Sequence, residues 1–537
     1  TLAYIPPTIA GIVLAYRGKL LAGGILTAFF IALQIMSNHV QMSYYFLFVI
    51  LFIAGAYFED AWRNKTLPRF FKASAVLLVA ALIGVAANLS NLYHTYTYSK
   101  ETMRGKSELV QTGDAAKQTS SGLDRDYITN WSYGIGETWT LLVPNFKGGS
   151  SSAPLSQSET AMEKANPMYG SLYNSFPQYF GSQPWTAGPV YVGAFVLFLF
   201  VLGCFIIKGP LKWALLGATF FVLAWGKNFM PLTDFFIDYV PMYNKFRAVS
   251  SILVIAEFTI PLLAIFALKR VLEEPGIWKA NKKAFGISLA LTAGVALLLT
   301  VAPGSLGSGF VPAQEAQMLQ NAVDQQMIPA NELSGILANL SEMRGVLVSA
   351  DALRSFIIIC IGCALLWLHA AGKLRRSLTV AGITALCLVD MWSVNKRYLH
   401  DEQFVPRSIQ TETFSKTKTD ELILQDKSPD YRVLNFATDA FNENNTSYWH
   451  KNIGGYHAAK LRRYQELIER HLSPEMQAAY QAIAAAGGEM DSVDASKFRV
   501  LNMLNTKYFI LPAGQQGQTV PVLNPYANGN AWFVKNV

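Results

Sequence analysis

The chain has 537 residues, of which 52% are hydrophobic and 15% are charged, and its mean hydropathy is +0.25. Soluble domains carry about 25% charged residues, so this composition excludes an ordinary water-soluble protein and is typical of a chain that crosses a bilayer repeatedly. The net charge of +8 lies in short loops between apolar runs, with no basic stripe interleaved with aromatic residues, and this excludes a nucleic-acid partner.

The apolar runs predict an α-helical polytopic membrane protein with about ten transmembrane helices. A helix needs about 20 apolar residues to cross ~30 Å of hydrocarbon. The predicted spans are residues 2–16, 20–37, 42–58, 73–91, 188–207, 211–225, 248–268, 284–302, 354–370 and 377–394. The sequence starts at Thr1 without a signal-peptide pattern, and its last residues, AWFVKNV, stop within a pattern. We therefore expect a fragment that lacks the N-terminal region and the C-terminal end of a longer protein.

The Lys and Arg residues predict the orientation of these spans, because cytoplasmic loops are enriched in both. With residues 17–19 inside, every inside loop contains Lys or Arg, and the shorter outside loops contain only Lys227, Lys245, Arg247, Arg344 and Arg354. This orientation predicts a transmembrane region, residues 1–394, with large outside loops at residues 92–187 and 303–353. Residues 395–537 are predicted to form an extracytoplasmic α+β domain.

Within that C-terminal domain, residues 431–436 and 498–511 read as strands, and residues 461–486 read as a helix. His450 and His457 have no third ligand at metal spacing, so zinc is not indicated. The sequence identifies no cofactor, and a divalent metal ion stays an open alternative.

Two charged residues mark the span at 248–268. Glu257 lies near its middle, where an ionisable group costs roughly 2.5–3.5 kcal/mol and normally faces a polar cavity or a partner. Pro261 leaves the Glu257 carbonyl without its helical donor. Glu257 either lines a site or hydrogen-bonds a neighbouring helix. Arg247, at the edge of the span, either grips a lipid phosphate or anchors the helix at the interface.

Further candidate ligand-binding residues lie in loops. The tight turn between the second and third spans contains Asn38, His39 and Gln41, which can hold sugar hydroxyls or a phosphate, or simply cap helix ends. The long loop contains Asp126 and Glu137 among aromatic residues, a combination suited to a carbohydrate and to a general base. The alternative is that both loop acids are only solvated.

Several stretches resemble the YfhO family of bacterial membrane proteins, in the form found in Bacteroidota. The resemblance spans essentially the whole chain. It rests on AYIPPTIAGIVLAYRGK (3–19), NHVQMSYY (38–45), GLDRDYITNWSYGIGETWTLLVPNFKGG (122–149), SQPWTAGPVYVGA (182–194), YNKFRAVSSILVIAEFTIPLL (243–263), GGYHAAKLRRYQELI (454–468) and LNTKYFIL (504–511).

The YfhO family is similar to the GT-C glycosyltransferases, which use polyprenyl-phosphate-linked sugars. The resemblance implies a multi-pass protein of the bacterial plasma (inner) membrane, with its large loops and C-terminal domain on the periplasmic side. It implies transfer of a sugar to an envelope glycan or glycolipid, with membrane lipid as a further partner. The catalytic acid of GT-C enzymes follows their first helix, so it is expected upstream of Thr1.

Within this chain, the expected roles follow from these assignments. Arg247 would hold the donor phosphate, and Asn38, His39 and Gln41 would hold the head group. Glu137 or Asp126 would bind the acceptor, and both are the candidates for a catalytic acid among the residues present. Glu257 would support the lipid groove. A non-catalytic envelope factor that binds or transports a lipid-linked glycan is the alternative function.

Overall fold

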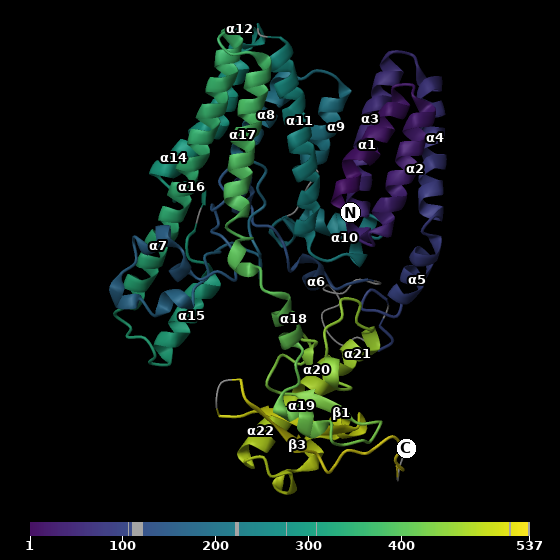
Figure 1. The fold of residues 1–537 in the computed structure, drawn as a ribbon, viewed down its shortest axis with the longest axis vertical. Coiled ribbons are helices and arrows are strands. Elements are labelled where there is room, and N and C mark those ends of the chain that lie inside the picture. Colours follow the sequence, from purple (N-terminus) through teal and green to yellow (C-terminus); the bar gives the residue numbers. More distant parts are fainter. Residues whose placement is uncertain are drawn as a thin grey trace. The chain divides into compact units, whose positions relative to one another are not determined.

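A computed structural model describes residues 1–105, 107–109, 122–220, 225–274, 276–307, 309–514 and 517–534, and these residues are mostly helical (Figure 1). The chain divides into two compact units. Unit 1 contains residues 1–92 and 124–400, and unit 2 contains residues 93–123 and 401–537. The long loop predicted at residues 92–187 is therefore shared between the two units.

Unit 1 has the helices of a membrane protein. Among the described residues, six helices are long and apolar enough to cross a bilayer, and three apolar helices are shorter. The six are α3 (Val40–Arg63), α4 (Leu67–Ala86), α11 with its preceding turn (Val249–Glu273), α13 to α14 (Lys282–Val301), α16 (Leu333–Ala370) and α17 (Arg376–Asn395). The shorter three are Leu2–Tyr16 (which ends in α1), Leu20–Met36 (α2) and Ala194–Ile206 (α8). The number of spans and their orientation stay predictions.

Small residues set the packing of the first helices. Helix α1 (Ile5–Tyr16) packs on α2, and α2 packs on α4. A Cβ atom added to Gly23 of α2 would lie 2.5 Å from the Ala15 backbone nitrogen and 2.6 Å from the Gly11 carbonyl oxygen. Only glycine lets the two backbones approach this closely, which is how helices associate where lipid removes the hydrophobic driving force.

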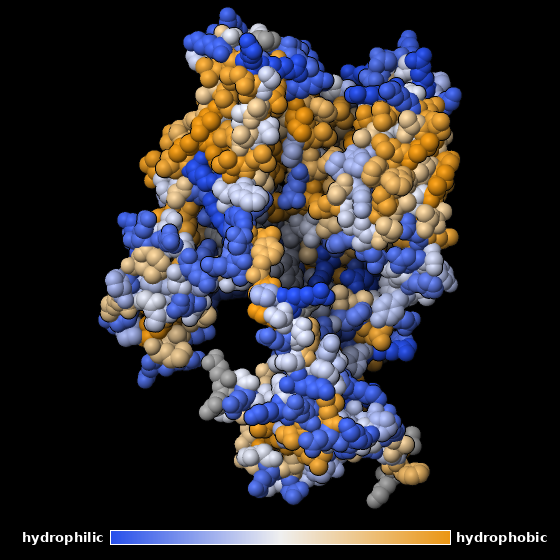
Figure 2. Space-filling view, in the orientation of Figure 1, coloured by the Kyte–Doolittle hydropathy of each residue, from blue (hydrophilic) through white to orange (hydrophobic). Residues whose placement is uncertain are grey.

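The other long helices form a second group, in which α11 packs on α8 and on α9 (Pro210–Phe220), and α16 packs on α14 and α17 (Figure 1). Residues 221–224 of the predicted span 211–225 lie outside the described residues. Many large hydrophobic side chains on the long helices of unit 1 are exposed, including Leu21 of α2, Leu78 of α4 and Leu388 of α17. Figure 2 shows such residues gathered over the middle of the helices of unit 1, with hydrophilic residues at the helix ends. This distribution is typical of helices whose middle parts contact the hydrocarbon core of a bilayer.

Two predicted spans differ from the structure. The predicted span 354–370 is the second half of α16, a single helix that begins at Leu333. The span predicted from residue 248 starts with a 3₁₀ turn, Val249–Leu253, after Ala248 in the left-handed conformation (φ 60°), and α11 proper is Val254–Glu273. Glu257 therefore lies in the first turn of α11, where the helix dipole favours a carboxylate, and not near the middle of a helix.

Unit 1 also contains short elements between its long helices. They are α6 (Arg125–Thr129), a 3₁₀ helix (Gly136–Leu141), α7 (Glu159–Met162), α10 (Met230–Tyr239) and α15 (Ala313–Asp324). Helix α15 is held on α16 by Arg344, a fully buried side chain that donates to both Glu315 oxygens at 2.6 and 2.9 Å. The same guanidinium donates to the carbonyls of Phe310 and Pro177, so it fixes three segments at once.

Unit 2 contains a three-stranded sheet in the order β1–β2–β3. Strand β1 (Arg432–Asn435) is parallel to β2 (Thr506–Pro512), and β2 is antiparallel to β3 (Thr519–Leu523). Its helices are α18 (Arg407–Thr413), α19 (Lys418–Ile423), α20 (Asn445–Trp449), α21 (Arg462–Leu467), α22 (Ser473–Ala485) and α23 (Arg499–Met503), and α5 (Leu89–Ser99) enters it from unit 1.

The predicted strands are correct in part. Residues 499–503, predicted as strand, form α23 because the Glu475 carboxylate accepts hydrogen bonds from the backbone nitrogens of Val500 and Leu501. Those first-turn nitrogens have no partner within the helix, so an acidic side chain from α22 stabilises the turn. The apolar pattern alone did not distinguish this turn from a strand.

Candidate functional site

The loop from residue 124 to residue 141 is fixed against the segment that leads into α11. Arg125 of α6 forms ion pairs with Asp234 at 2.5 Å and Asp238 at 2.6 Å, both on α10. The Ser250 backbone nitrogen donates to the Trp131 carbonyl at 3.1 Å, and the Asn228 amide donates to the Tyr133 carbonyl at 3.0 Å. These bonds bring residues 124–141, predicted to bind carbohydrate, beside residues 247–257.

Arg247 lies between two aromatic residues of that loop. Its guanidinium is 5.7 Å from the ring centres of both Tyr127 and Trp131, and its Nη1 donates to the Tyr127 hydroxyl at 2.9 Å. The side chain is only half-buried. An arginine beside aromatic rings and accessible to solvent is suited to bind a phosphate, because the rings hold the planar guanidinium and its N–H donors in one orientation.

Gln41 joins the predicted turn at residues 37–41 to Arg247. The Gln41 amide donates to the Arg247 carbonyl at 2.8 Å and to the Tyr45 hydroxyl at 3.0 Å. Asn38, whose φ is 56°, accepts a hydrogen bond from Asn91 at 3.3 Å, and His39 is exposed. His39 occupies the N-cap of α3 without a side-chain capping bond. Of these three residues, the structure brings Gln41 to Arg247.

Glu137 is a buried carboxylate held by three donors, with only 2% of the residue exposed. It accepts from the Gly134 nitrogen at 2.5 Å, from the Ser182 nitrogen at 3.2 Å and from the Tyr179 hydroxyl. Burial raises the pKa of Glu137 above its ordinary value, although these hydrogen bonds and the Lys147 charge favour the ionised form. Burial also lowers the pKa of Lys147, which the Glu137 carboxylate opposes.

Tyr133 is buried near the carboxylates of Glu137 and Glu257. Its hydroxyl is 2.5 Å from Thr140 Oγ1. Burial raises the pKa of Tyr133, the bond with Thr140 lowers it, and the nearby carboxylates of Glu137 and Glu257 raise it. Among the described residues, the Glu257 carboxylate has no hydrogen-bond or ion-pair partner, and the side chain is exposed. Glu257 can therefore accept a hydrogen bond from a ligand.

A cavity of about 10 Å³ adjoins these groups, lined in part by Tyr133, Glu137, Lys147 and Tyr179. This volume is enough for about one water molecule. Asp126, the other predicted loop acid, is exposed on α6. No group of three His, Cys, Asp or Glu residues in the described part of the chain is arranged to hold a metal ion.

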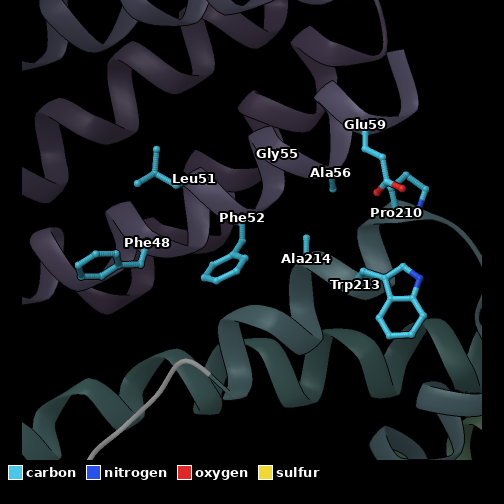
Figure 3. Close-up of a pocket in the computed structure, with 9 residues that line it drawn as sticks. All are labelled: Phe48, Leu51, Phe52, Gly55, Ala56, Glu59, Pro210, Trp213 and Ala214. Carbon is cyan, nitrogen blue, oxygen red and sulfur yellow. The ribbon is translucent and has the colours of Figure 1, made fainter. Parts of the chain in front are cut away.

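A larger apolar groove of about 450 Å³ lies between α3 and α9 (Figure 3). Figure 3 shows Phe48, Leu51 and Phe52 on one wall, facing Ala214 and Trp213 on the other. On α3, Gln41 and Phe48 are seven residues apart, and Phe52 and Glu59 follow at 11 and 18 residues from Gln41. These spacings place all four on one helix face. The groove thus starts about 10 Å along α3 from the contact between Gln41 and Arg247.

A buried charge network between the middle of α16 and the C-terminal end of α17 was missed by the sequence reasoning. Arg354 donates to Asp390 at 2.5 Å, and Tyr191 donates to the same carboxylate at 2.8 Å. Arg397 binds both oxygens of Asp351, at 2.9 and 2.7 Å. Asp390 is an acid within a predicted span, so the argument applied to Glu257 could have identified it. The roles of Lys147 and Tyr179 had no such signal.

Comparison of the chain with protein-family models, with curated proteins and with solved structures gives no match. The fold and the site thus define a helical protein with apolar helices suited to a bilayer and a polar, aromatic site beside α11.

Proposed function

We propose that this chain is a membrane glycosyltransferase of the GT-C kind, similar to the YfhO family, in the plasma membrane of a bacterium. It transfers a sugar from a polyprenyl-phosphate donor to a glycan or glycolipid of the cell envelope, on the outer face of that membrane. The observation that supports this most is the position of the Arg247 guanidinium, 5.7 Å from the ring centres of both Tyr127 and Trp131, just before the segment that leads into α11.

The polyprenyl-phosphate donor requires one site for its charged phosphate and one for its hydrocarbon chain. Arg247 supplies the cation for a phosphate, and the rings of Tyr127 and Trp131 supply flat apolar faces for a sugar. The apolar face of α3 that begins near Gln41 leads to the groove at α9, which suits a polyprenyl chain. A ligand with a phosphate head and a long apolar tail matches both features.

The acceptor requires hydrogen-bond acceptors for its hydroxyl groups. Glu257, in the first turn of α11, is an exposed carboxylate whose oxygens are open to a ligand, and Asp126 on α6 is a second exposed acid. Glu137, with three donors, holds the Tyr179 hydroxyl and the backbone at Gly134 and Ser182 in place. A base that removes the proton of the acceptor hydroxyl completes an inverting transfer. The polyprenyl phosphate is the leaving group, and the candidates for the base among the residues of this chain are Glu137 and Asp126.

One observation favours a second function, a non-catalytic envelope factor that binds or transports a lipid-linked glycan. Both oxygens of Glu137, the most deeply buried of the candidate acids, are already occupied by protein donors. A carboxylate fixed in this way is suited to hold the loop in shape and is poorly placed to take a proton from a ligand. This alternative predicts donor binding without transfer.

The experiment is transfer from a labelled polyprenyl-phosphate sugar by the full protein in proteoliposomes. We expect Arg247→Ala to lower kcat/KM by roughly 10- to 100-fold, mostly through KM, because a charged hydrogen bond contributes about 1.5–3 kcal/mol. Arg247→Lys should recover part of this, since lysine offers a point charge in place of a fork. The control is Lys227→Ala, which removes an exposed charge from the same region.

Unchanged transfer by Arg247→Ala would reject Arg247 as the phosphate ligand. Saturable donor binding by the unaltered protein without any transfer would reject the transferase and favour the binding factor. Absence of both binding and transfer would reject both functions.

A further inference from the structure

Unit 2 contains a polar cleft of about 370 Å³, separate from the site beside α11. Its lining comes from the start of β1, from the chain after α23 and from the last described residues. The side chains that matter are Asp430, Arg432, Lys451, Asn505, Asn530 and Trp532. Most are charged or amide groups, so the cleft is unsuited to an apolar ligand, whose sites are lined mainly by hydrophobic side chains.

The polar groups are held by one another. Asp430 accepts from Asn530 at 3.1 Å and from Lys451 at 3.2 Å, and Asn505 donates to the Asp430 carbonyl. Asn505 has a φ of 57°, a left-handed conformation that few residues other than glycine adopt. Such mutual bonds fix the directions of donors and acceptors before a ligand arrives, which lowers the entropic cost of binding.

Trp532 adds an apolar surface to this polar cleft. The residue is 42% exposed, and among the described residues no hydrogen bond or ring contact involves its indole. A flat apolar face beside fixed amides and charges matches a sugar ring, which has a face of C–H groups and an edge of hydroxyls. Arg432 and Lys451 against Asp430 leave one positive charge in excess, which favours a sugar that bears a carboxylate or phosphate.

We propose that this cleft binds a sugar residue of an acidic glycan, with Trp532 stacked on the ring and Arg432 facing the anionic group. That the bound glycan is the acceptor of the transfer rests on the proposed function. That the cleft binds a glycan does not rest on it. Binding and transfer therefore have to be measured separately.

The test measures binding by the full protein in detergent, without donor lipid, using three soluble probes. These are an oligogalacturonate, a maltooligosaccharide of the same length and an oligoglutamate peptide. We expect the oligogalacturonate to bind tightest. Trp532→Ala should weaken its binding about tenfold, since an aromatic contact contributes about 0.5–1.5 kcal/mol beyond the area it buries. Phe533→Ala, which removes the fully exposed neighbouring ring, should leave binding unchanged.

Arg432→Gln should remove the preference for the oligogalacturonate over the maltooligosaccharide and leave weak binding of both. Equal binding of both sugars by the unaltered protein would overturn the acidic class of ligand. Equal binding of the peptide, or full binding after Trp532→Ala, would overturn a sugar site. Normal glycan binding together with absent transfer would reject the transferase alone, so the two proposals fail separately.

Discussion

Glu137 shows how one buried carboxylate joins chain segments that are distant in sequence. Its donors include Tyr179 and Ser182, which lie 42 and 45 residues further along the chain. The aromatic residues around Glu137 in the sequence predict carbohydrate binding, but no sequence pattern indicates its hydrogen-bond partners Tyr179 and Ser182. Hydrogen bonds between loop residues that are distant in sequence depend on the tertiary fold, so no periodic sequence pattern predicts them.

Removing the carboxylate should therefore cost more stability than removing one donor. Tyr179→Phe deletes one hydrogen bond to a charged group, worth about 1.5–3 kcal/mol. Glu137→Ala leaves two backbone N–H groups and a hydroxyl without their acceptor in a buried place, so we expect it to lower the melting temperature further. Thermal unfolding of the purified protein in detergent measures both. Glu163→Ala, at an exposed acid, is the control, and equal melting of Glu137→Ala and Glu163→Ala would contradict this role.

At the scale of elements, hydropathy located most of the apolar helices but not how each helix continues. The span predicted from residue 248 is broken by the left-handed Ala248 and a 3₁₀ turn, because bonds such as that from Ser250 to Trp131 hold the backbone outside the helix. Helix α16 begins at Leu333, well before residue 354, where hydropathy predicted the start of the span. Hydropathy predicts the part of a helix that can contact lipid. It does not predict how far the helix continues as a polar segment beyond that part.

The contact between Gln41 and Arg247 could not be derived from the sequence either. These residues are 206 positions apart, and both were selected only for their polarity beside a predicted span. The sequence could indicate that each residue belongs to an interface region, but the packing of α3 near α11 that brings them together needed the structure.

Packing of α1 on α2 gives a prediction at the same scale. Gly23→Leu should force the two helices apart, because even a Cβ atom would lie 2.5 Å from the Ala15 nitrogen. Overpacking of this kind costs about 1–3 kcal/mol or more. The matched control is Gly286→Leu in α13, where a Cβ atom meets nothing within 4 Å. Thermal unfolding in detergent distinguishes the two, and equal stability of both variants would contradict the close approach of α1 and α2.

For the whole molecule, the charge distribution predicts one orientation in the membrane. Reporter fusions after Lys65, Lys283 and Arg376 should be cytoplasmic, and fusions at Ser150 and Asn435 should be outside, because Lys and Arg concentrate in cytoplasmic loops. Paired alkaline phosphatase and green fluorescent protein reporters measure this. A cytoplasmic signal at Ser150 would overturn the orientation and place the site beside α11 on the wrong face for the proposed donor.

Helix α16 is long enough that a small tilt would move its far end by several ångströms. Its 38 residues span ~57 Å, so in the predicted membrane arrangement, with ~30 Å of hydrocarbon, roughly half of the helix extends beyond the bilayer. A tilt of about 5° would move its far end by ~5 Å. On that half, Arg344 donates to the Pro177 carbonyl, two residues before the Tyr179 that binds Glu137. Because tilting is one way in which a helix accommodates a change in bilayer thickness, we expect a change of thickness to displace the segment that holds this carboxylate.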